Sequence, residues 1–472
     1  MPAVRASEAP ARANLLFVFA DEFRGSALGS AGNADVRTPW LDALAGAGLR
    51  FTHACANSAV CTPARGTILT GCWPSTHRAM ANDLPVDPGA PSMARVLGAA
   101  GYRCGYIGKW HLGGIPRSRF IPPGPERLGF DHYWAAWNCS HDYFGARYHR
   151  DTPEPISIAG RYEPEAQTDL ALEFISDAGG ERRRTLREPW CLVLSYGPPH
   201  EPYRPLPPGY EGLYDPGALA LRPNCPDTAT YRQDLADYYT HVTALDDQVG
   251  RLLTALQERG ELERTLVVFT SDHGSMLGSQ GRENKHAPWD EATVVPLLVR
   301  FGAEMEGRRV GVDDLLVGHV DLAPTVLGLL GHEPDHRMEG LDLSAHVLGK
   351  QGGRPTSIFL QALICADQAM KDGLFEWRGI RTSRTTYAVD VRGPWLLYDN
   401  VSDPFQQRNL IDGSDEASLA LLTDAHHQLE DWMAHTADRL EPKEAVLARY
   451  GLTKAWEERA AHNRALRATA RT

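Results

Sequence analysis

Four residues with metal-binding side chains occur in two short groups. Asp21 and Glu22 follow the apolar run LLFVFA, and Asp272 and His273 follow the run TLVVFTS. Carboxylates that gather at strand ends repel one another unless a cation neutralises them, and oxygen-rich sites favour Ca²⁺ or Mg²⁺ over Zn²⁺. The four residues therefore indicate a divalent metal site. Each aspartate taken alone is equally consistent with a helix N-cap or a loop position.

Two lysines and two histidines follow other apolar runs. Lys109 and His111 are two residues apart in GYIGKWHLGG, so they point the same way if the segment is extended. His200 lies in the proline-bounded loop YGPPHEPY, and Lys285 follows Asp272 and His273 in SDHGSMLGSQGRENKH. A lysine can stabilise an anion that is being transferred, and a histidine can carry a proton. The alternative for the first pair is an ordinary glycine-rich loop with a solvated lysine.

One cysteine stands in an unusual context. VCTPARGTILTG places Cys61, Pro63 and Arg65 at alternate positions ahead of an apolar turn and a glycine. Such a cysteine is either a packed thiol or a reactive group. The eight cysteines of the 472-residue chain are scattered without a framework of short spacings. We therefore expect reduced thiols.

The elements that must position these residues follow from the hydrophobic pattern. Apolar runs suited to strands buried on both faces lie at 15–20, 191–196, 265–272 and 294–301. Helix-like segments lie at 38–48, 91–101, 168–178 and 234–260. This alternation predicts a doubly wound α/β fold with a large mixed, mostly parallel sheet flanked by helices. Chemistry in such sheets lies beyond the carboxyl ends of the strands, where Asp21 and Asp272 fall.

The sequence pattern changes after about residue 350. The segment 377–410 has the alternation and turn residues of an antiparallel sheet, and a charged helical tail begins near Asp415. We therefore predict a catalytic α/β domain over residues 1–350. A smaller α+β subdomain over residues 351–472 would contain a small antiparallel sheet and a helical tail.

Composition restricts the partners. The formal net charge of −12 argues against a surface for nucleic acid or an anionic membrane, because both need clustered lysine and arginine. The apolar run 15–20 is too short for a signal-peptide core or a membrane span. We expect a cytoplasmic protein that binds neither nucleic acid nor membrane.

The motif around Cys61 resembles the signature of the formylglycine-dependent (type I) sulfatases, which belong to the alkaline-phosphatase-like superfamily. In that family the cysteine of Cys-x-Pro-x-Arg is converted to formylglycine after synthesis. Five further stretches resemble the same family in the same order, and they are GKWHLG, SDHGSMLGSQG, PPHEPY, NKHAPWDEATVVPLLVR and LLYDNVSDPFQQRNL. The resemblance therefore covers nearly the whole chain and implies the alkaline-phosphatase-like fold.

The resemblance also implies a reaction and its residues. The chain would cleave a sulfate monoester through a covalent sulfo-enzyme intermediate, after a formylglycine-generating enzyme has modified Cys61. The catalytic positions are Cys61, Arg65, Lys109, His111, His200 and Lys285. The metal positions are Asp21, Glu22, Cys61, Asp272 and His273, with Ca²⁺ as the usual ion and Mg²⁺ or Mn²⁺ as alternatives. The substrate would be a small-molecule or carbohydrate sulfate ester.

Three positions depart from the family pattern. Ala64 stands where the family often has serine, and the motif tolerates this because Cys61, Pro63 and Arg65 are kept. Glu22 stands where many members have a second aspartate, so its longer side chain puts its role as a ligand in doubt. His273 stands where others have asparagine, a variant that the family also uses.

Two other functions remain open from the sequence. A phosphonate monoester hydrolase or phosphodiesterase of the same superfamily shares the metal site and the formylglycine. The Lys-Trp-His stretch from Lys109 to His111 is more similar to the sulfate-specific branch. A non-catalytic binding protein is the second alternative, and the full set of polar site residues argues against it, because buried unpaired charges are costly.

The aromatic stretch 130–149 is the candidate for substrate contact. Its Trp134, Trp137 and Tyr143 either hold a sugar or aryl ring or pack the loop onto the domain. His77, Arg78 and Asn82 follow the cysteine motif and are candidates for the same pocket.

Overall fold

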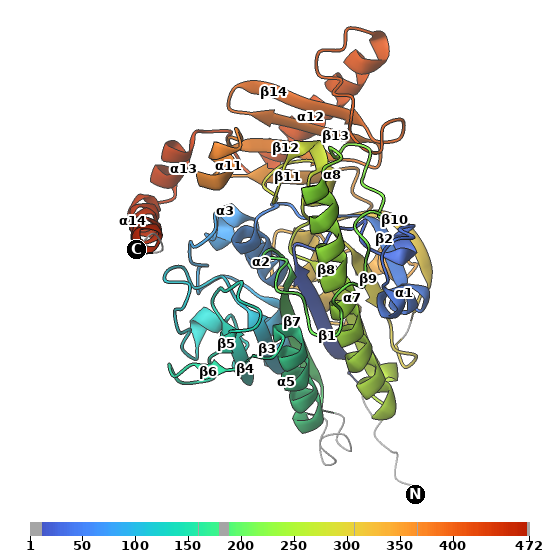
Figure 1. Ribbon diagram of the computed structural model, residues 1–472, viewed down its shortest axis with the longest axis vertical. Coiled ribbons are helices and arrows are strands. Elements are labelled where there is room, and N and C mark those ends of the chain that lie inside the picture. The colour runs from blue at the N-terminus through green and yellow to red at the C-terminus, as the bar shows by residue number, and fades with distance from the viewer. Residues whose placement is uncertain (1–11, 159, 179–187, 306, 366, 470–472) are drawn as a thin grey trace, which may run out of the picture.

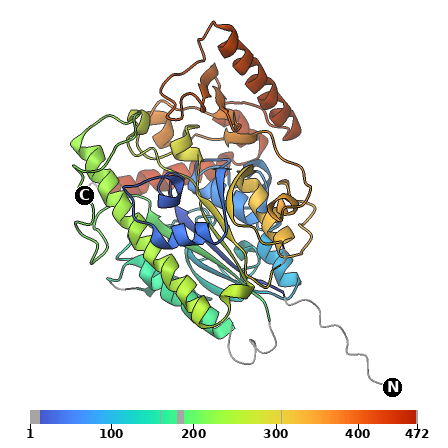
Figure 2. The same ribbon diagram turned by 90° about the vertical axis from the view of Figure 1, so that its right-hand side faces the viewer.

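The fold is a central sheet covered by helices on both faces, with a second, smaller sheet at one end. The computed structural model describes residues 12–158, 160–178, 188–305, 307–365 and 367–469. In Figure 1 the orange elements of the C-terminal part lie above the large sheet and the red helix that ends at the C-terminus lies to its left, and Figure 2 shows helices on its two sides.

The large sheet has eight strands in the order β10-β2-β9-β8-β1-β7-β3-β4. In that order they are β10 (Gly311–Gly318), β2 (Leu49–Cys55), β9 (Leu297–Arg300), β8 (Thr265–Ser271), β1 (Asn14–Asp21), β7 (Trp190–Pro199), β3 (Arg103–Lys109) and β4 (Tyr133–Trp137). Only β9 runs antiparallel to its neighbours among these strands. The predicted mixed, mostly parallel α/β sheet is confirmed.

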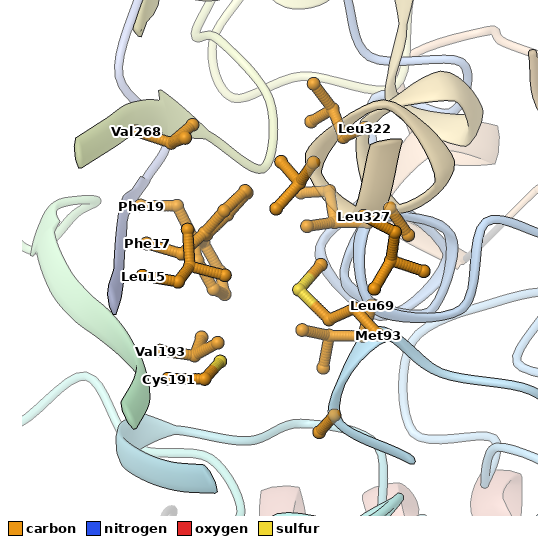
Figure 3. Packing of buried hydrophobic residues seen from close by; sticks show 14 of the residues in the cluster. Leu15, Phe17, Phe19, Leu69, Met93, Cys191, Val193, Val268, Leu322 and Leu327 are labelled. Carbon is orange, nitrogen blue, oxygen red and sulfur yellow. The ribbon is translucent and has the colours of Figure 1, made fainter. Parts of the chain in front are cut away.

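Alternate residues of strand β1 pack into two different hydrophobic clusters, one on each face of the sheet. Leu15, Phe17 and Phe19 belong to one buried cluster, whereas the alternate residues Leu16 and Val18 belong to another. Figure 3 shows the first three side chains pointing towards the helices on one face of the sheet. We expect truncation of Phe17 to alanine to lower the free energy of unfolding by about 3 to 5 kcal/mol, because it would leave a cavity in this core.

The helices divide between the two faces. Residues of α2 (Cys61–Thr70), α4 (Met93–Ala99) and α9 (Leu322–Leu329) join the first cluster, and residues of α1 (Pro39–Gly46), α5 (Glu163–Ala178) and α7 (Ala229–Glu258) join the second. The shorter helices are α3 (Pro74–His77), α8 (Asp290–Thr293), α10 (Ser344–Val347) and α11 (Asp367–Lys371). The 3₁₀ turns are Gly29–Ala31, Pro125–Arg127, Leu262–Arg264, Ser279–Gly281 and His319–Asp321. Strands β5 (Arg147–Tyr148) and β6 (Ile156–Ser157) form a small separate pair.

The second sheet is antiparallel throughout. Its strands are β11 (Ile358–Ala362), β12 (Trp377–Arg381), β13 (Thr385–Asp390) and β14 (Gly393–Asp399). The tail contains α12 (Glu416–His435), α13 (Lys443–Arg449) and α14 (Thr453–Thr469). Helix α12 packs against this sheet, whereas α13 and the start of α14 pack near Met80 and Leu84 of the large domain. A small antiparallel sheet and a helical tail are therefore present after residue 350, and the exact domain boundary stays a prediction.

No helix in the described ranges is both long enough and apolar enough to cross a membrane.

Candidate active site

The site forms where neighbouring strands of the large sheet end. Asp21 is the last residue of β1, Lys109 is the last residue of β3, and His200 directly follows β7. Asp272 directly follows β8, the other neighbour of β1. Four distant segments of the chain therefore deliver a polar side chain to one edge of the sheet, as the sequence predicted.

Cys61 lies at the centre of these residues. It is the first residue of α2 and is 1% exposed, with its Sγ 3.2 Å from Nε2 of His273 and 3.8 Å from Oδ1 of Asp21. Burial by itself raises the pKa of the thiol, but Lys109, Lys285 and His273 outweigh it and hold the pKa well below its usual value. The helix N-terminus also favours negative charge at this position. Cys61 is therefore not simply a packed core thiol.

The helix that carries Cys61 is fixed on several sides. The Thr62 backbone N–H donates to Oδ1 of Asn82 at 3.0 Å, which satisfies one free amide of the first turn of α2. Gly66 lies so close to the His77 ring that a Cβ there would be 2.5 Å from it. His77 is completely buried, and Arg78 donates to the backbone of Tyr450. His77 therefore fixes the surroundings of α2 and does not line a substrate pocket, whereas a place for Arg78 in that pocket stays a prediction.

Arg65 is the positive charge beside the acidic cluster. Its Nη2 lies 3.1 Å from Oδ2 of Asp21 and 2.9 Å from Oδ2 of Asp272, and its Nη1 donates to Oγ of Ser195 at 2.7 Å. All three charged side chains are completely buried. The arginine therefore partly neutralises two carboxylates that would otherwise repel each other.

Four side chains form a set with metal-ligand geometry. Atoms of Asp21, Cys61, Asp272 and His273 that can bind a metal all lie within 4.8 Å of one another, and all four residues are buried. Burial and the neighbouring Asp21 raise the pKa of Asp272. Two buried carboxylates and one imidazole whose ligand atoms lie this close together fit a divalent cation.

Glu22 lies beside this set but its carboxylate points elsewhere. Its Oε2 accepts from Nζ of Lys285 at 2.7 Å and is 3.1 Å from Nε2 of His200. The Oε1 atom is buried and has no hydrogen-bond partner within the described part of the chain. Glu22 has a φ of 67°, so the chain turns sharply at the end of β1. Its predicted role as a metal ligand stays a prediction, and Oε1 is the atom that is available for it.

The basic residues enclose Cys61 from the other sides. Nζ of Lys109 donates to Asp21, and Nζ of Lys285 contacts Nε2 of His200. Nδ1 of His200 lies 2.6 Å from the carbonyl oxygen of Glu201, which favours a proton on Nδ1 and leaves Nε2 facing the site. Burial and Lys285 lower the pKa of His200, but carboxylates, led by that of Glu22, outweigh them and raise it.

His111 is held by a carboxylate that the sequence did not reveal. It has a φ of 53°, so the extended geometry expected from Lys109 to His111 ends at the strand terminus. Its Nε2 lies 3.1 Å from Oδ1 of buried Asp83, which also accepts from Arg117. Burial lowers the pKa of His111, but Cys139 and Asp83 outweigh this and raise it to about 10. The carboxylate therefore favours proton uptake by the ring.

His141 is a second residue that the sequence analysis did not single out. Its ring is stacked on that of His200, with centroids 4.1 Å apart and an interplanar angle of 9°. Its Nε2 is 3.0 Å from Nζ of Lys109. Burial, His200 and Lys109 lower the pKa of His141 well below its usual value, so the ring stays neutral. The only sequence signal was its place within the stretch 130–149.

The aromatic residues of this stretch pack the domain. Trp134 is 2% exposed, and its ring centroid lies 5.5 Å from that of Tyr106. The ring of Trp137 stacks on that of His149. Tyr143 is also buried, and its hydroxyl donates to the carbonyl oxygen of His200 at 2.7 Å. The packing interpretation therefore holds for Trp134, and Tyr143 helps to hold the His200 loop.

Comparison with known proteins identifies the family. A family model described as Sulfatase matches residues 13–332. The chain belongs to the sulfatase family. This sulfatase is 35% identical to the ulvan-active sulfatase of Formosa agariphila over 454 residues. The aligned region covers 95% of this chain and 86% of that protein. It is 29% identical to the endo-4-O-sulfatase of Bacteroides thetaiotaomicron, over 84% and 87% of the two chains.

Solved structures agree with this assignment. The YidJ sulfatase structure from Bacteroides fragilis matches this sulfatase with a TM-score of 0.81 and 29% identity, over 93% of this chain and 99% of that one. A phosphonate monoester hydrolase of Agrobacterium radiobacter matches with a TM-score of 0.70 and 25% identity, over 90% of this chain and 96% of that one. The comparisons therefore support a hydrolase of sulfate esters with the alkaline-phosphatase-like fold.

Proposed function

We propose that this sulfatase hydrolyses a sulfate monoester of a carbohydrate, with a formylglycine made from Cys61 and with a bound divalent cation. One observation carries the mechanism. The cysteine of the Cys-x-Pro-x-Arg motif lies at the start of α2, 3.2 Å from His273, within a buried group of carboxylates, lysines and histidines. The name of the ulvan-active relative supports a carbohydrate as the alcohol.

The residues of the chain have distinct parts in this proposal. Asp21, Asp272 and His273 would hold the cation, and Glu22 would join them through Oε1. When both are present, the hydrated aldehyde supplies the attacking oxygen, and the cation lowers its pKa and screens the sulfate charge. Arg65 would keep the acidic side chains in place.

The basic residues would bind the sulfate and move protons. The ammonium groups of Lys109 and Lys285 would neutralise the sulfate oxygens as charge shifts to the leaving group. His200, when its ring is charged, would donate a proton from Nε2 to the departing alcohol, and His111, which Asp83 favours as the charged imidazolium, would steer the hydrated aldehyde by hydrogen bonding.

The chain needs a maturation partner in this proposal. A formylglycine-generating enzyme would act on Cys61 with Pro63 and Arg65 as the recognised neighbours. All three residues are buried in the folded protein. The enzyme would therefore act on the chain before it folds.

The test is to express the chain with and without a formylglycine-generating enzyme and to measure the mass of the Cys61 peptide. Both samples are then assayed with 4-nitrophenyl sulfate, an aryl phosphonate monoester and an aryl phosphodiester, with Cys61→Ala as the inactive control. We expect turnover only in the aldehyde-containing sample, with the sulfate hydrolysed fastest. Faster turnover of a phosphorus ester would overturn the sulfate specificity, and turnover by Cys61→Ala would overturn the mechanism.

A further inference from the structure

Two adjacent residues outside the reacting centre hold two of its parts. Oδ1 of Asn82 accepts the backbone N–H of Thr62 at 3.0 Å, at the first turn of the helix that carries Cys61. Oδ1 of Asp83 lies 3.1 Å from Nε2 of His111. The pair of Asn82 and Asp83 therefore fixes the start of α2 and the His111 ring together.

Thr62 links the same two parts directly. Its hydroxyl donates to the carbonyl oxygen of His111 at 2.9 Å. A shift of the Asn82–Asp83 pair would therefore move Cys61 relative to His111. A displacement of about 1 Å between reacting groups can lower a rate about a hundredfold.

The C-terminal helix α14 reaches this pair through Arg459. Nε of Arg459 donates to the carbonyl oxygen of Asn82 at 2.8 Å and lies 3.9 Å from Oδ2 of Asp83. The arginine side chain is only 6% exposed, so solvent screens these interactions little. One buried arginine therefore contacts both residues that support the site.

Apolar packing next to this arginine holds α14 against the large domain. Trp456 belongs to a buried cluster that includes Met80 and Leu84, which flank the Asn82–Asp83 pair. The guanidinium of Arg459 lies 4.3 Å from the ring centroid of Trp456, and the two residues share one face of α14 because they are three positions apart. Docking of that face therefore places Arg459 on the pair.

The backbone of Asp83 also depends on its surroundings. It has a φ of 69°, which residues other than glycine rarely adopt and which persists only where neighbouring contacts fix it. Arg117 donates to both oxygens of the Asp83 carboxylate, at 2.8 and 3.1 Å. Two arginines therefore lie at the carboxylate that holds His111, and Arg459 is the one that comes from the C-terminal tail.

We propose that Arg459 is a positioning residue for the sulfatase reaction, and that α14 thereby completes the active site from the C-terminal subdomain. This inference rests on the proposed function, because Cys61 and His111 act in it. Loss of Arg459 would remove a donor from the buried Asn82 carbonyl and a cation from beside Asp83. The alternative is that Arg459 only fastens α14 to the large domain, which would affect stability and leave the chemical step unchanged.

The experiment compares Arg459→Ala with Arg459→Lys, which keeps a positively charged donor. The matched control is Arg464→Ala, at an exposed arginine of the same helix. Each variant is co-expressed with the formylglycine-generating enzyme, and kcat and KM for 4-nitrophenyl sulfate are corrected for the aldehyde content of the Cys61 peptide. Melting temperatures show that each variant is folded in the assay, and Arg459→Gln replaces Arg459→Ala if the alanine variant is not.

We expect Arg459→Ala to lower kcat about tenfold with less than about a threefold change in KM, because the reacting groups shift while the lysines that bind sulfate keep their partners. Arg459→Lys should recover part of the loss, and Arg464→Ala should match the parent. Added to Asp83→Asn, the Arg459→Ala change should cost much less than tenfold, since both residues act on the same ring. A parental kcat in Arg459→Ala, or losses that simply multiply in the double variant, would overturn the inference.

Hydrogen exchange of the unconverted thiol form gives a readout that does not depend on turnover. The Thr62 amide should exchange faster in Arg459→Ala than in the parent and in Arg464→Ala, because its acceptor Asn82 is held less firmly. Equal exchange in all three proteins would overturn the positioning role. Failure of the proposed function would instead appear as absent 4-nitrophenyl sulfate turnover in the aldehyde-containing parent, and the Thr62 exchange rate would still decide the role of Arg459.

Discussion

His141 lies parallel to His200 in the active site, with ring centroids 4.1 Å apart and an interplanar angle of 9°. Nε2 of His141 also lies 3.0 Å from Nζ of Lys109. One neutral imidazole therefore contacts both the residue proposed to protonate the leaving group and one proposed to bind sulfate. Two flat rings in contact restrict each other's rotation, so His141 acts as a positioning residue.

Replacing His141 with alanine should lower kcat about tenfold, because His200 and Lys109 lose a common contact. The loss should be larger for an alkyl sulfate than for 4-nitrophenyl sulfate, since a poor leaving group depends more on proton donation. His141→Phe, which keeps the stacked ring, should recover part of the activity. His336→Ala, at an exposed histidine, is the control. Equal kcat values for wild type and His141→Ala on both substrates would remove His141 from the mechanism.

Asp83 should support His111 through its charge. Burial alone raises the pKa of Asp83, but hydrogen bonds from His111 and Arg117 outweigh it and hold that pKa well below its usual value. Asp83→Asn keeps the shape but removes the charge, so we expect kcat to fall roughly tenfold with a smaller change in KM. The comparison is Asp87→Asn, at an exposed position in the same segment. If the Asp83 variant lost only melting temperature and kept its kcat, the carboxylate would be purely structural.

The main strands were accessible to prediction because they are buried on both faces. Strands β1, β7 and β8 appear in the sequence as continuous apolar runs, and every residue of each is buried. Strand β10 was missed because its first half alternates between exposed and buried residues at the sheet edge, and β3 was missed because glycines interrupt its apolar pattern.

Only some of the site residues could be predicted from the sequence, for a related reason. A polar residue that directly follows an apolar run can be recognised from the sequence, and Asp21 and Asp272 were predicted as site residues in this way. His141 and Asp83 reach the site from loops, and a loop has no periodicity that could show where its side chains point. The direction of the Glu22 carboxylate depends on a φ of 67° at one residue, which spacing along the chain cannot show.

The stability of the protein should fall in acid because of buried neutral histidines such as His77. Burial lowers the pKa of His77 from about 6.5 to about 3, while Nδ1 accepts the backbone N–H of Ala79. Below pH 6.5 the unfolded chain binds a proton at this ring and the folded chain does not, so stability is lost as the pH falls from 6.5 towards 3. The contribution is about 1.4 kcal/mol per pH unit well below 6.5.

Urea unfolding at pH 7 and pH 5 measures this effect. We expect His77→Gln to lose less stability than wild type between the two pH values, by about 2 kcal/mol, because glutamine does not titrate. The control is His336→Gln, which makes the same exchange at an exposed histidine. Identical pH dependence in wild type and His77→Gln would show that His77 does not contribute.

The burial of the cysteine motif predicts the order of maturation. Cys61 is 1% exposed and Arg65 is completely buried, and every residue of α2 is buried. A modifying enzyme cannot reach the thiol unless α2 leaves the core, and that removal would expose a large part of the apolar surface packed against β1. We therefore expect conversion of Cys61 when the formylglycine-generating enzyme is present during synthesis and almost none when it is added to the folded chain.

Peptide mass spectrometry of three samples decides this prediction. They are the co-expressed protein, the purified folded thiol form incubated with the enzyme, and the same thiol form incubated while unfolded in urea at a concentration that the enzyme tolerates. A short synthetic peptide with the sequence VCTPARGTILTG, from Val60 to Gly71, controls for enzyme activity in each buffer. Conversion in the first and third samples but not in the second is expected, because only the folded core hides the motif. Efficient conversion of the folded form would mean that α2 opens readily, and the core around Ile68 and Leu69 would then be much less stable than its burial indicates.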